Sequence, residues 1–367
     1  MDAGVITRTE RYARWGGEDL AGLGSSDPVD AARLAGADRP VDLSRAVFLD
    51  IETADGGAVF LVGLGQLAPD GRLQVRQHLA PSPLAEVDLL EGVHERLARS
   101  EALVTFNGLS FDLPGLMARA RRQGLAVRRP EAVHWDLLPT ARRLLGETFP
   151  SRALGFLEGA LLGVRRELDV PSAEVPARYR QFLASGDPTL LEPVLAHNAA
   201  DVATMAALAL RFLRHYRGEG LVRATDRWSL ARIRAKEGRL AEADRLFAQA
   251  WADLDPVRRV RLAREWSRVL WRLGEPRRRR ELLEELARAP GPVDPAVLVA
   301  IAKDAEHRER DLARALAAAS RARQLLLLRS RLAGRPPDPR QLDAVDHRIA
   351  RLTGRLVPSP PKRSGGA

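Results

Sequence analysis

The sequence predicts an α/β domain with a mixed sheet, followed by an all-α region built from helical repeats. Between residues 46 and 145, short apolar segments first follow one another and then alternate with segments of helical periodicity. Such a pattern is typical of a sheet flanked by helices. From residue 221 the pattern is almost wholly helical and repeats. With 367 residues the chain is also too long for one ordinary domain, so we expect two.

The predicted sheet opens with the segment 47–53, which has the length and composition of a buried strand. Two more strands follow after turn signals, and these three are expected to form an antiparallel meander. Shorter strands then alternate with helices. The predicted strands are residues 47–53, 58–67, 73–79, 102–106 and 132–135. The predicted helices are residues 83–99, 113–123, 137–145, 152–162, 173–184 and 190–216.

The regions outside this domain differ from it in composition. Residues 1–40 are rich in Gly, Asp and Ala without sustained periodicity, so they are interpreted as a poorly ordered leader. The segment 217–220, with two glycines, predicts a boundary between a first domain of residues 41–216 and a second of residues 221–355. Residues 356–367 are of low complexity and are predicted to be disordered.

The second domain contains a repeat with a period of 36 residues. Segments starting at Gly238, Gly274 and Arg310 align, and each follows another helical segment. Helix pairs with a period of about 34 residues are typical of tetratricopeptide-type (TPR-like) repeats. The third segment has Arg where the first two have a turn glycine, so generic helical hairpins are the alternative interpretation.

The excess of basic over acidic side chains is confined to the C-terminal part of the chain. Residues 217–367 carry 34 basic and 20 acidic side chains, whereas residues 1–216 carry 24 basic and 28 acidic ones. A basic domain beside a slightly acidic one suggests a polyanionic partner, with nucleic acid the usual candidate. The alternative is that these arginines merely solvate helix faces in an Arg-rich chain.

The composition also excludes several classes of site. The chain contains no cysteine, so disulfides, thiolate metal ligands and cysteine nucleophiles are excluded. Its first 20 residues are charged and lack the apolar core of a signal peptide. No segment has the roughly 18 uninterrupted apolar residues of a membrane span. We therefore expect a cytoplasmic protein without a membrane partner.

Two carboxylates interrupt the opening strand. Asp50 and Glu52 are two residues apart, so on a strand both side chains point to the same face. Two ionised groups on a buried face repel each other and lose hydration, at a cost of several kcal/mol each unless a cation compensates. A divalent metal is the simplest such cation. The alternative is a strand that ends at Leu49, with both acids in a solvated turn.

Two later carboxylates stand out by their context. Asp112 lies where a buried strand turns into a helix, and an ordinary helix cap is the alternative interpretation. His197 and Asp201 are four residues apart, so they share one face of a helix. A structural pair on a partly buried face is the alternative for these two residues.

Four carboxylates in this order suit two-metal nuclease chemistry. Such sites need several carboxylates that converge on ions about 3.5–4 Å apart, and a nearby His or Tyr can orient or deprotonate the attacking water. The order and its surroundings resemble the DEDD exonucleases of the ribonuclease H-like fold, and more narrowly the YprB-type ribonuclease H-like proteins of bacteria. The motifs that carry the resemblance are Phe-Leu-Asp-Ile-Glu-Thr at 48–53, Phe-Leu-Val-Gly-Leu-Gly at 60–65, Thr-Phe-Asn-Gly-Leu-Ser-Phe-Asp at 105–112, Trp-Asp-Leu-Leu at 135–138 and Leu-Ala-His-Asn-Ala-Ala-Asp-Val at 195–202.

The resemblance implies a ribonuclease H-like mixed sheet over about residues 41–215. It also implies that two Mg²⁺ or Mn²⁺ ions are bound by Asp50, Glu52, Asp112 and Asp201, with His197 near the nucleophilic water. In one branch of these exonucleases a His precedes the last Asp by five residues, and in the other a Tyr precedes it by four. Here a His stands four residues before Asp201. Roles as general base and as a group that orients the water or the scissile phosphate are both open.

Two further polar residues are candidates around this site. Asn107 lies in the same turn as Asp112, and a substrate contact and a turn-capping role are equally compatible with its position. Asp136 follows the last predicted strand of the sheet. It is expected to cap the next helix, and an approach to the site is the alternative.

The sequence therefore predicts a metal-dependent nuclease. A 3′→5′ exonuclease that hydrolyses phosphodiester bonds at the ends of single-stranded DNA or RNA is the expected activity. Two other classes of function stay open. A nucleic-acid-binding module would keep the fold without turnover, and a protein–protein scaffold would act through the helical repeats of residues 221–355.

Overall fold

The computed structural model describes residues 4–126, 130–166, 169–288 and 293–356. Its contacts divide the chain into two compact units, Met1–Val222 and Arg223–Ala367. The first unit contains the sheet, and the described part of the second consists of helices. The predicted disordered tail lies, apart from Leu356, outside the described residues.

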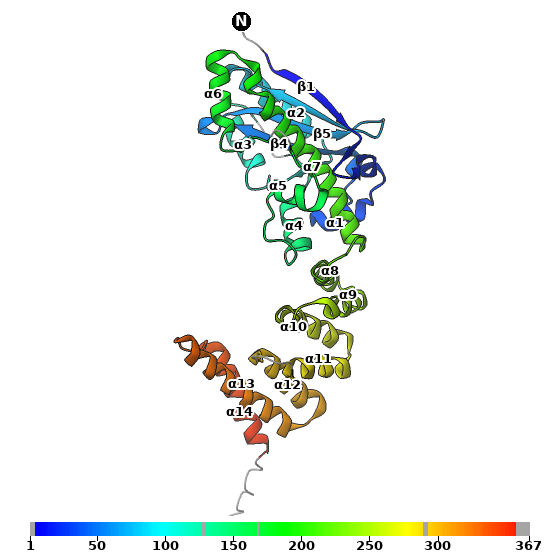
Figure 1. The fold of residues 1–367 in the computed structure, drawn as a ribbon, viewed down its shortest axis with the longest axis vertical. Helices are drawn as coiled ribbons and strands as arrows, with labels where there is room; N and C mark the ends of the chain where they lie inside the picture. Colours follow the sequence, from blue (N-terminus) through cyan, green and yellow to red (C-terminus); the bar gives the residue numbers. More distant parts are fainter. Residues whose placement is uncertain (1–3, 127–129, 167–168, 289–292, 357–367) are drawn as a thin grey trace, which may run out of the picture. The chain divides into compact units, whose positions relative to one another are not determined.

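A six-stranded mixed sheet forms the centre of the first unit (Figure 1). Its strand order is β1-β6-β5-β4-β7-β8. The strands are β1 (Ile6–Tyr12), β4 (Ala46–Thr53), β5 (Val59–Leu67), β6 (Leu73–Leu79), β7 (Ala102–Thr105) and β8 (Val133–Asp136), and a separate ribbon is made by β2 (Arg14–Trp15) and β3 (Glu18–Asp19). Strands β4, β5 and β6 pair antiparallel in sequence order, whereas β4, β7 and β8 pair parallel. The predicted mixed sheet is confirmed.

Residues 4–40 belong to this unit, so the prediction of a poorly ordered leader is wrong for them. β1 pairs antiparallel with β6 along its whole length and forms the edge of the sheet. Its side chains are largely polar on both faces, because an edge strand is held by backbone hydrogen bonds and needs little apolar burial. Beyond β1, the side chains of Leu20, Leu23 and Leu34 are buried in the core.

Helices cover both faces of the sheet. α2 and α3 pack against apolar side chains of β4 and β5 on one face, and α7 packs against β4, β5 and β6. The helices of this unit are α1 (Pro28–Ala35), α2 (Glu86–Ala98), α3 (Asp112–Arg122), α4 (Leu137–Leu145), α5 (Leu154–Leu157), α6 (Val175–Ser185) and α7 (Glu192–Arg217), with a short π-helix, η5 (Glu158–Leu162), after α5.

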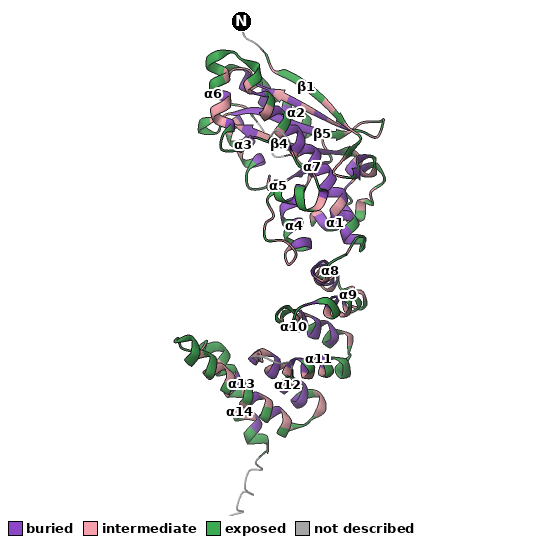
Figure 2. Ribbon diagram, in the orientation of Figure 1, coloured by how far each residue is buried: buried purple, intermediate pink, exposed green. Residues whose placement is uncertain are grey.

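The long helix α7 is the core helix of the first unit. Among the described residues, one helical stretch, Pro188–Arg217, is long and apolar enough to cross a membrane, with a mean hydropathy of 1.2. However, 78% of the apolar part of this stretch is buried inside the protein. In Figure 2, α7 is coloured as buried along most of its length. Its apolar composition is therefore explained by packing on the sheet.

The second unit is a series of helices, each packed against the next. They are α8 (Ala224–Lys236), α9 (Leu240–Asp253), α10 (Pro256–Leu273), α11 (Pro276–Arg288), α12 (Pro295–Asp304), α13 (Leu312–Ala333) and α14 (Pro339–Leu356), with a short π-helix, η7 (Ala305–Glu309), after α12. The three aligned segments of the sequence fall at the starts of α9, α11 and α13. At these starts Gly238, Gly274 and Arg310 all have positive φ, of 79°, 77° and 56°. The third turn is thus built like the first two without a glycine, and the TPR-like nature of the helix pairs stays a prediction.

Candidate active site

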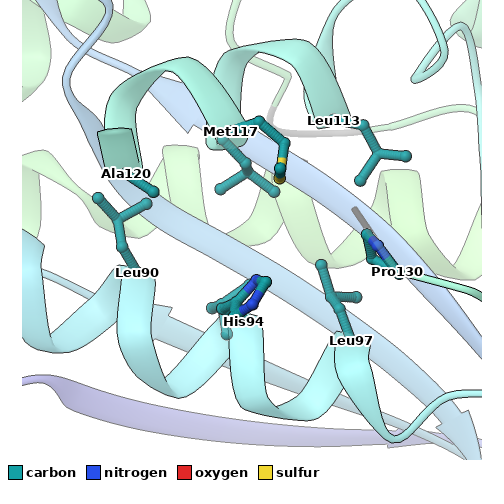
Figure 3. Close-up of a pocket in the computed structure, with 9 residues that line it drawn as sticks. Leu90, His94, Leu97, Leu113, Met117, Ala120 and Pro130 are labelled. Atoms are coloured by element: carbon teal, nitrogen blue, oxygen red, sulfur yellow. The ribbon is translucent and has the colours of Figure 1, made fainter. Parts of the chain in front are cut away.

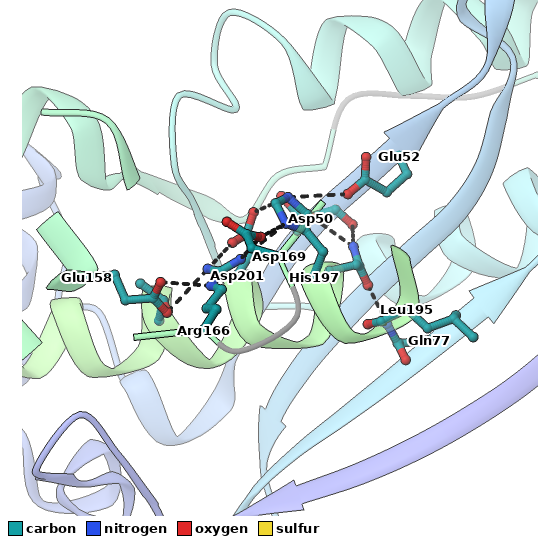
Figure 4. Close-up of polar contacts among 11 residues, drawn as sticks. Asp50, Glu52, Gln77, Glu158, Arg166, Asp169, Leu195, His197 and Asp201 are labelled. Atoms are coloured by element: carbon teal, nitrogen blue, oxygen red, sulfur yellow. Dashed lines mark hydrogen bonds and ion pairs between the residues drawn. The ribbon is translucent and has the colours of Figure 1, made fainter. Parts of the chain in front are cut away.

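The first two acids lie on β4, in the interior of the sheet. β4 pairs with β7 over residues 46–48 and with β5 over residues 48–53, so its side chains leave above or below the sheet. Leu49 belongs to the core on the α2–α3 face, whereas Asp50 and Glu52 contact residues of α7 (Figure 4). The alternative of a strand that ends at Leu49 does not hold, because β4 continues to Thr53 and Glu52 is 9% exposed.

Asp112 enters the site from the turn between β7 and α3. It is the first residue of α3, and the residue at the capping position is Phe111, so Asp112 is not the helix cap. Its carboxylate instead accepts hydrogen bonds from its own backbone N–H and from that of Ile51, the residue between the two acids of β4. This bond ties the start of α3 directly to β4.

Asp136 shapes the turn that precedes Asp112. Its Oδ1 accepts hydrogen bonds from the backbone N–H groups of Asn107, at 2.8 Å, and Leu138, at 3.0 Å, and its Oδ2 accepts one from Leu109, at 3.2 Å. Asp136 therefore caps α4, as expected, and also holds the turn. Asn107 has a φ of 68°, a conformation that Asn tolerates better than most residues. A substrate contact by its side chain stays a prediction.

α7 supplies Asp201 and His197, together with Asn198, a residue that the sequence did not single out. Asn198 is fully buried, and its Nδ2 donates to Asp50 Oδ2 at 2.7 Å. Its Oδ1 accepts a hydrogen bond from Gln77 Nε2 at 2.9 Å. Because Gln77 fixes which end of the Asn198 amide is the oxygen, the other end must present an N–H to Asp50.

Two glycines on β5 allow α7 to come this close to the sheet. A Cβ atom at Gly63 would lie 2.3 Å from Asn198 Oδ1, and one at Gly65 would lie 2.5 Å from Val202 Cγ1. Real Cβ contacts are longer, so any larger residue would push α7 away from β5. In the motif at residues 60–65, the two glycines therefore support the site by leaving room for α7.

The buried acids raise one another's pKa. Burial is the largest cause for Asp50, whose pKa lies well above its usual value, and the carboxylates of Asp201, Glu52 and Asp112 raise it further. Burial also raises the pKa of Glu52 to about 7, although His197 acts in the opposite direction. The pKa of Asp112 is raised to about 6, again chiefly by burial. Burial and neighbouring carboxylates therefore both disfavour the charged forms of these three acids.

Asp201 differs from the other acids because a buried arginine pairs with it. Arg166 Nη2 donates to Asp201 Oδ1, and Arg166 Nε donates to Glu158 Oε2 at 2.8 Å. The side chain of Arg166 is 9% exposed. Glu158, on η5, in turn accepts a hydrogen bond from Thr204 on α7. Arg166 thus fastens the segment after η5 to α7 and places one positive charge beside the acids.

Comparisons with known proteins agree with this geometry. The sequence model of the RNase H superfamily matches residues 47–212. This span runs from β4 to α7 and contains all four acids. Over these residues the first unit is similar to ribonuclease H superfamily domains. The chain is also 32% identical over 225 residues to the uncharacterized protein YprB of Bacillus subtilis (strain 168), across 58% of this chain and 54% of YprB. It therefore spans about half the length of this curated relative.

One solved structure shows a weak likeness to the chain. It is the family B DNA polymerase from the hyperthermophilic archaeon Pyrobaculum calidifontis, with a TM-score of 0.36 and 17% sequence identity. The likeness covers 56% of this chain and 29% of the polymerase chain. A likeness of this size carries no conclusion about function.

Members of the ribonuclease H superfamily commonly use divalent metals, and the donors of this domain fit such ions in their chemistry. Carboxylate oxygens are the ligands that Mg²⁺ and Mn²⁺ prefer, and Asp50 and Asp112 accept hydrogen bonds from neutral amide groups. In spacing the fit is incomplete. Within the described ranges, no three Asp, Glu or His side chains lie close enough together to hold one ion. The acids would therefore have to draw together around it.

The first unit also contains a small, partly open cavity on the α2–α3 face of the sheet (Figure 3). Its volume is about 20 Å³, and its lining is largely apolar, with Leu90 and Leu97 of α2 facing Leu113 and Met117 of α3. A cavity of this size holds about one water molecule. It is too small for a nucleotide, so this cavity is not a substrate site.

Proposed function

We propose that this protein is a divalent-metal-dependent nuclease that removes nucleotides from the 3′ end of single-stranded nucleic acid. The observation that carries the proposal is the group of largely buried acids Asp50, Glu52 and Asp112, each with a raised pKa, inside a domain similar to the ribonuclease H superfamily. Such a group destabilises the fold unless a cation from solution relieves the repulsion. The 3′→5′ direction and the single-strand preference rest on the motif resemblance to DEDD exonucleases.

Each acid has a part in the proposed reaction. Asp50, Glu52, Asp112 and Asp201 would hold two Mg²⁺ or Mn²⁺ ions, which when bound lower the pKa of a water molecule and neutralise charge on the leaving oxygen. Asn198 keeps the Asp50 carboxylate turned toward α7. The backbone N–H of Ile51 does the same for Asp112.

His197 is the candidate proton acceptor. Its Nε2 lies 3.5 Å from Asp201 Oδ2 and 4.0 Å from Glu52 Oε1, on the side of the ring that faces the acids. A histidine in this position can accept a proton from the attacking water, provided that Nε2 carries its lone pair.

A substrate panel tests the proposal. Labelled single and double strands of DNA and RNA, with free and blocked 3′ ends, are incubated with the full chain in Mg²⁺, Mn²⁺ or EDTA. We expect metal-dependent shortening from free 3′ ends in the wild type and none in Asp50→Asn. Asp70→Asn is the matched control, because Asp70 is an exposed turn residue and Asn can replace it as acceptor for Arg72 N–H.

The panel also separates the competing functions. Binding of single strands without cleavage in any metal would replace the nuclease with a nucleic-acid-binding module. Cleavage that is equal in Asp50→Asn and the wild type would contradict the assignment of the acids. Circular dichroism of each variant shows whether a loss of activity reflects a loss of fold.

We further propose that the second unit helps to bind the polyanion, although part of its basic charge is already neutralised. Within the basic run at the start of α11, Arg278 pairs with Asp244 and Arg279 pairs with Asp304. Arg277 is exposed. The number of arginines available to a nucleic acid is therefore smaller than the number that this unit carries.

The salt dependence of binding tests this contribution. Arg268→Glu with Arg277→Glu, two exposed residues of the second unit, should weaken single-strand binding and reduce its salt slope by about 0.7 for each phosphate that is no longer neutralised. Arg99→Glu, at an exposed position of the first unit, is the control. An unchanged slope in the double variant would favour a protein partner for the helices.

A further inference from the structure

His197 lies between the acids of the site and the segment that follows η5. Its Nδ1 is 2.7 Å from Asp169 Oδ1, on the side of the ring away from the contacts of Nε2 with Asp201 and Glu52. The side chain of His197 is 12% exposed, so the ring is held in this orientation by its surroundings. As Figure 4 shows, the ring is bracketed by two sets of carboxylates.

Two groups compete for Nδ1, and they require opposite tautomers. The Asp169 carboxylate requires a proton on Nδ1, whereas Arg166 Nη1, at 3.2 Å, requires a bare nitrogen there. The contact with Asp169 is shorter, at 2.7 Å, and a hydrogen bond to a carboxylate is charge-assisted. Arg166 Nη1 also has another acceptor, Asp169 Oδ1 at 3.5 Å, and the Nε and Nη2 of Arg166 donate to Glu158 and Asp201. These contacts favour the neutral tautomer with the proton on Nδ1 and the lone pair on Nε2.

We propose that Asp169 is a positioning residue for His197, which it holds with the Nε2 lone pair directed at the acids of the site. The catalytic role of this positioning rests on the proposed nuclease function. During hydrolysis a water molecule gives one proton to Nε2 while its oxygen forms the new bond to phosphorus. The bond to the 3′ oxygen breaks, and that oxygen keeps the electron pair and takes up a proton from solvent. The imidazolium that forms is stabilised by the Asp169 carboxylate.

The proposal also explains how Nε2 keeps its lone pair although Asp201 lies four residues away on the same helix. Residues four apart lie on one helix face, so a proton on Nε2 would be donated to Asp201 Oδ2, at 3.5 Å. A neutral imidazole has one ring proton, and Asp169 draws it to the opposite side of the ring. Asp169 is 55% exposed, so its charge stays hydrated and costs little to maintain.

The tautomer of His197 tests the proposal without requiring turnover. Ring-nitrogen NMR signals are recorded for the full chain with ¹⁵N-labelled histidine in EDTA from about pH 6 to about pH 9, a range that brackets the usual pKa of histidine and identifies the signals of the neutral ring. His197→Gln identifies the signals of His197. We expect a proton on Nδ1 in the wild type and a shift of that proton toward Nε2 in Asp169→Asn. Asp187→Asn is the control, because Asp187 is an exposed helix cap and Asn caps equally well.

Kinetics with a single-stranded substrate supply the second measurement. Asp169→Asn is expected to lower kcat by about 10- to 100-fold, the usual effect of removing a group that orients a catalytic side chain. KM should be unchanged, because Asp169 acts through His197 and not on the substrate. Asp169→Glu keeps the carboxylate and should recover part of the loss.

Each outcome bears on the proposal in a defined way. A proton on Nε2 in the wild type, or the same tautomer in Asp169→Asn, would overturn it and favour Arg166 as the partner of Nδ1. Equal kcat values for Asp169→Asn and the Asp187→Asn control would show that the positioning of His197 by Asp169 does not contribute to catalysis. If the expected tautomers occur in a wild-type protein that cleaves no substrate, Asp169 still positions His197, and the nuclease function fails instead.

Discussion

Buried acids are stabilised in the second unit and left in mutual repulsion in the first. In the second unit, the Glu306 side chain of η7 is fully buried and accepts hydrogen bonds from Arg348, Arg351 and Arg355, all on α14. The hydrogen bond from Arg351 is the main reason why the pKa of Glu306 is lowered to about 2. In the first unit, burial and neighbouring acids raise the pKa of Asp50 instead.

This difference separates two uses of a buried carboxylate. Arginines from the same chain neutralise the charge of Glu306. The ion pairs hold α14 against η7, and Glu306 needs no cation from solution. Asp50 and Asp112 receive neutral N–H donors, which leave their negative charge uncompensated. A fold keeps such charge at a cost in stability, and perturbed acids of this kind cluster at functional sites. Substitutions at the two places should therefore have opposite effects.

The largest expected effect is at Glu306. Glu306→Gln removes the partner of three arginines and should lower the free energy of unfolding of the second unit by about 2–3 kcal/mol. Part of the usual loss is avoided, because the side chains of Arg351 and Arg355 are 37% and 51% exposed and can be hydrated. Hydrogen exchange followed on peptides of α14 measures the change. Exchange as slow as in the wild type would show that the ion cluster does not hold α14.

Asp50→Asn should act in the opposite direction in metal-free protein. Removal of one of the mutually repelling charges is expected to raise the free energy of unfolding of the first unit by about 1–2 kcal/mol at neutral to basic pH. Hydrogen exchange of β4 peptides in EDTA is the measurement, with Asp70→Asn as the control. A destabilised Asp50→Asn would mean that this carboxylate is a structural group, as Glu306 is.

A smaller effect is expected at Asn198, which orients Asp50 without carrying charge. Asn198→Ala should weaken Mn²⁺ binding about tenfold, as for other residues that support a metal ligand. Gln77→Leu, which frees the Asn198 amide to turn, should weaken it less. Calorimetric titration with Mn²⁺ provides both values. Unchanged binding in Asn198→Ala would show that Asp50 needs no positioning.

The pH dependence of stability should have opposite signs in the two units. The pKa of Glu306 is lowered from 4.5 to about 2 on folding, so its contribution is present above about pH 4.5 and is lost as the pH falls toward 2. The pKa of Glu52 is raised from 4.5 to about 7, so the folded state binds its proton more tightly and this contribution is lost as the pH rises through about 7.

Between pH 5 and 8, metal-free protein should therefore lose stability in the first unit, while Glu306 contributes no change in the second. Hydrogen exchange of β4 and α14 peptides in EDTA at several pH values separates the two units. Parallel trends in both sets of peptides would contradict the assignment. Added Mg²⁺ should remove the trend in β4.

The sequence predicted the elements whose pattern is set by local rules. β6 (Leu73–Leu79) and α4 (Leu137–Leu145) occur with the predicted bounds, because strict alternation and a capping Asp136 mark them. Asp50 and Glu52 were placed on one face of a strand by its period of two. β1 was missed because it is an edge strand, whose polar residues on both faces give no apolar alternation.

Most of the residues that support the acids could not be predicted. Asn198, Gln77, Arg166 and Asp169 act through contacts between segments far apart in the chain, and no local pattern distinguishes them from other polar residues. One signal was available. The glycines of β5 interrupt an otherwise apolar strand, and a glycine inside a strand often marks the close approach of another segment.

The central claim is that Asp50 and Glu52 of β4, Asp112 of α3 and Asp201 of α7 form a divalent-metal site. Equilibrium binding of Mn²⁺ to the full chain, followed by electron paramagnetic resonance, tests it most directly because it requires no substrate. We predict saturable binding in the wild type that is lost in Asp50→Asn and retained in Asp70→Asn. No saturable binding in the wild type, or equal binding in the wild type and Asp50→Asn, would contradict the claim.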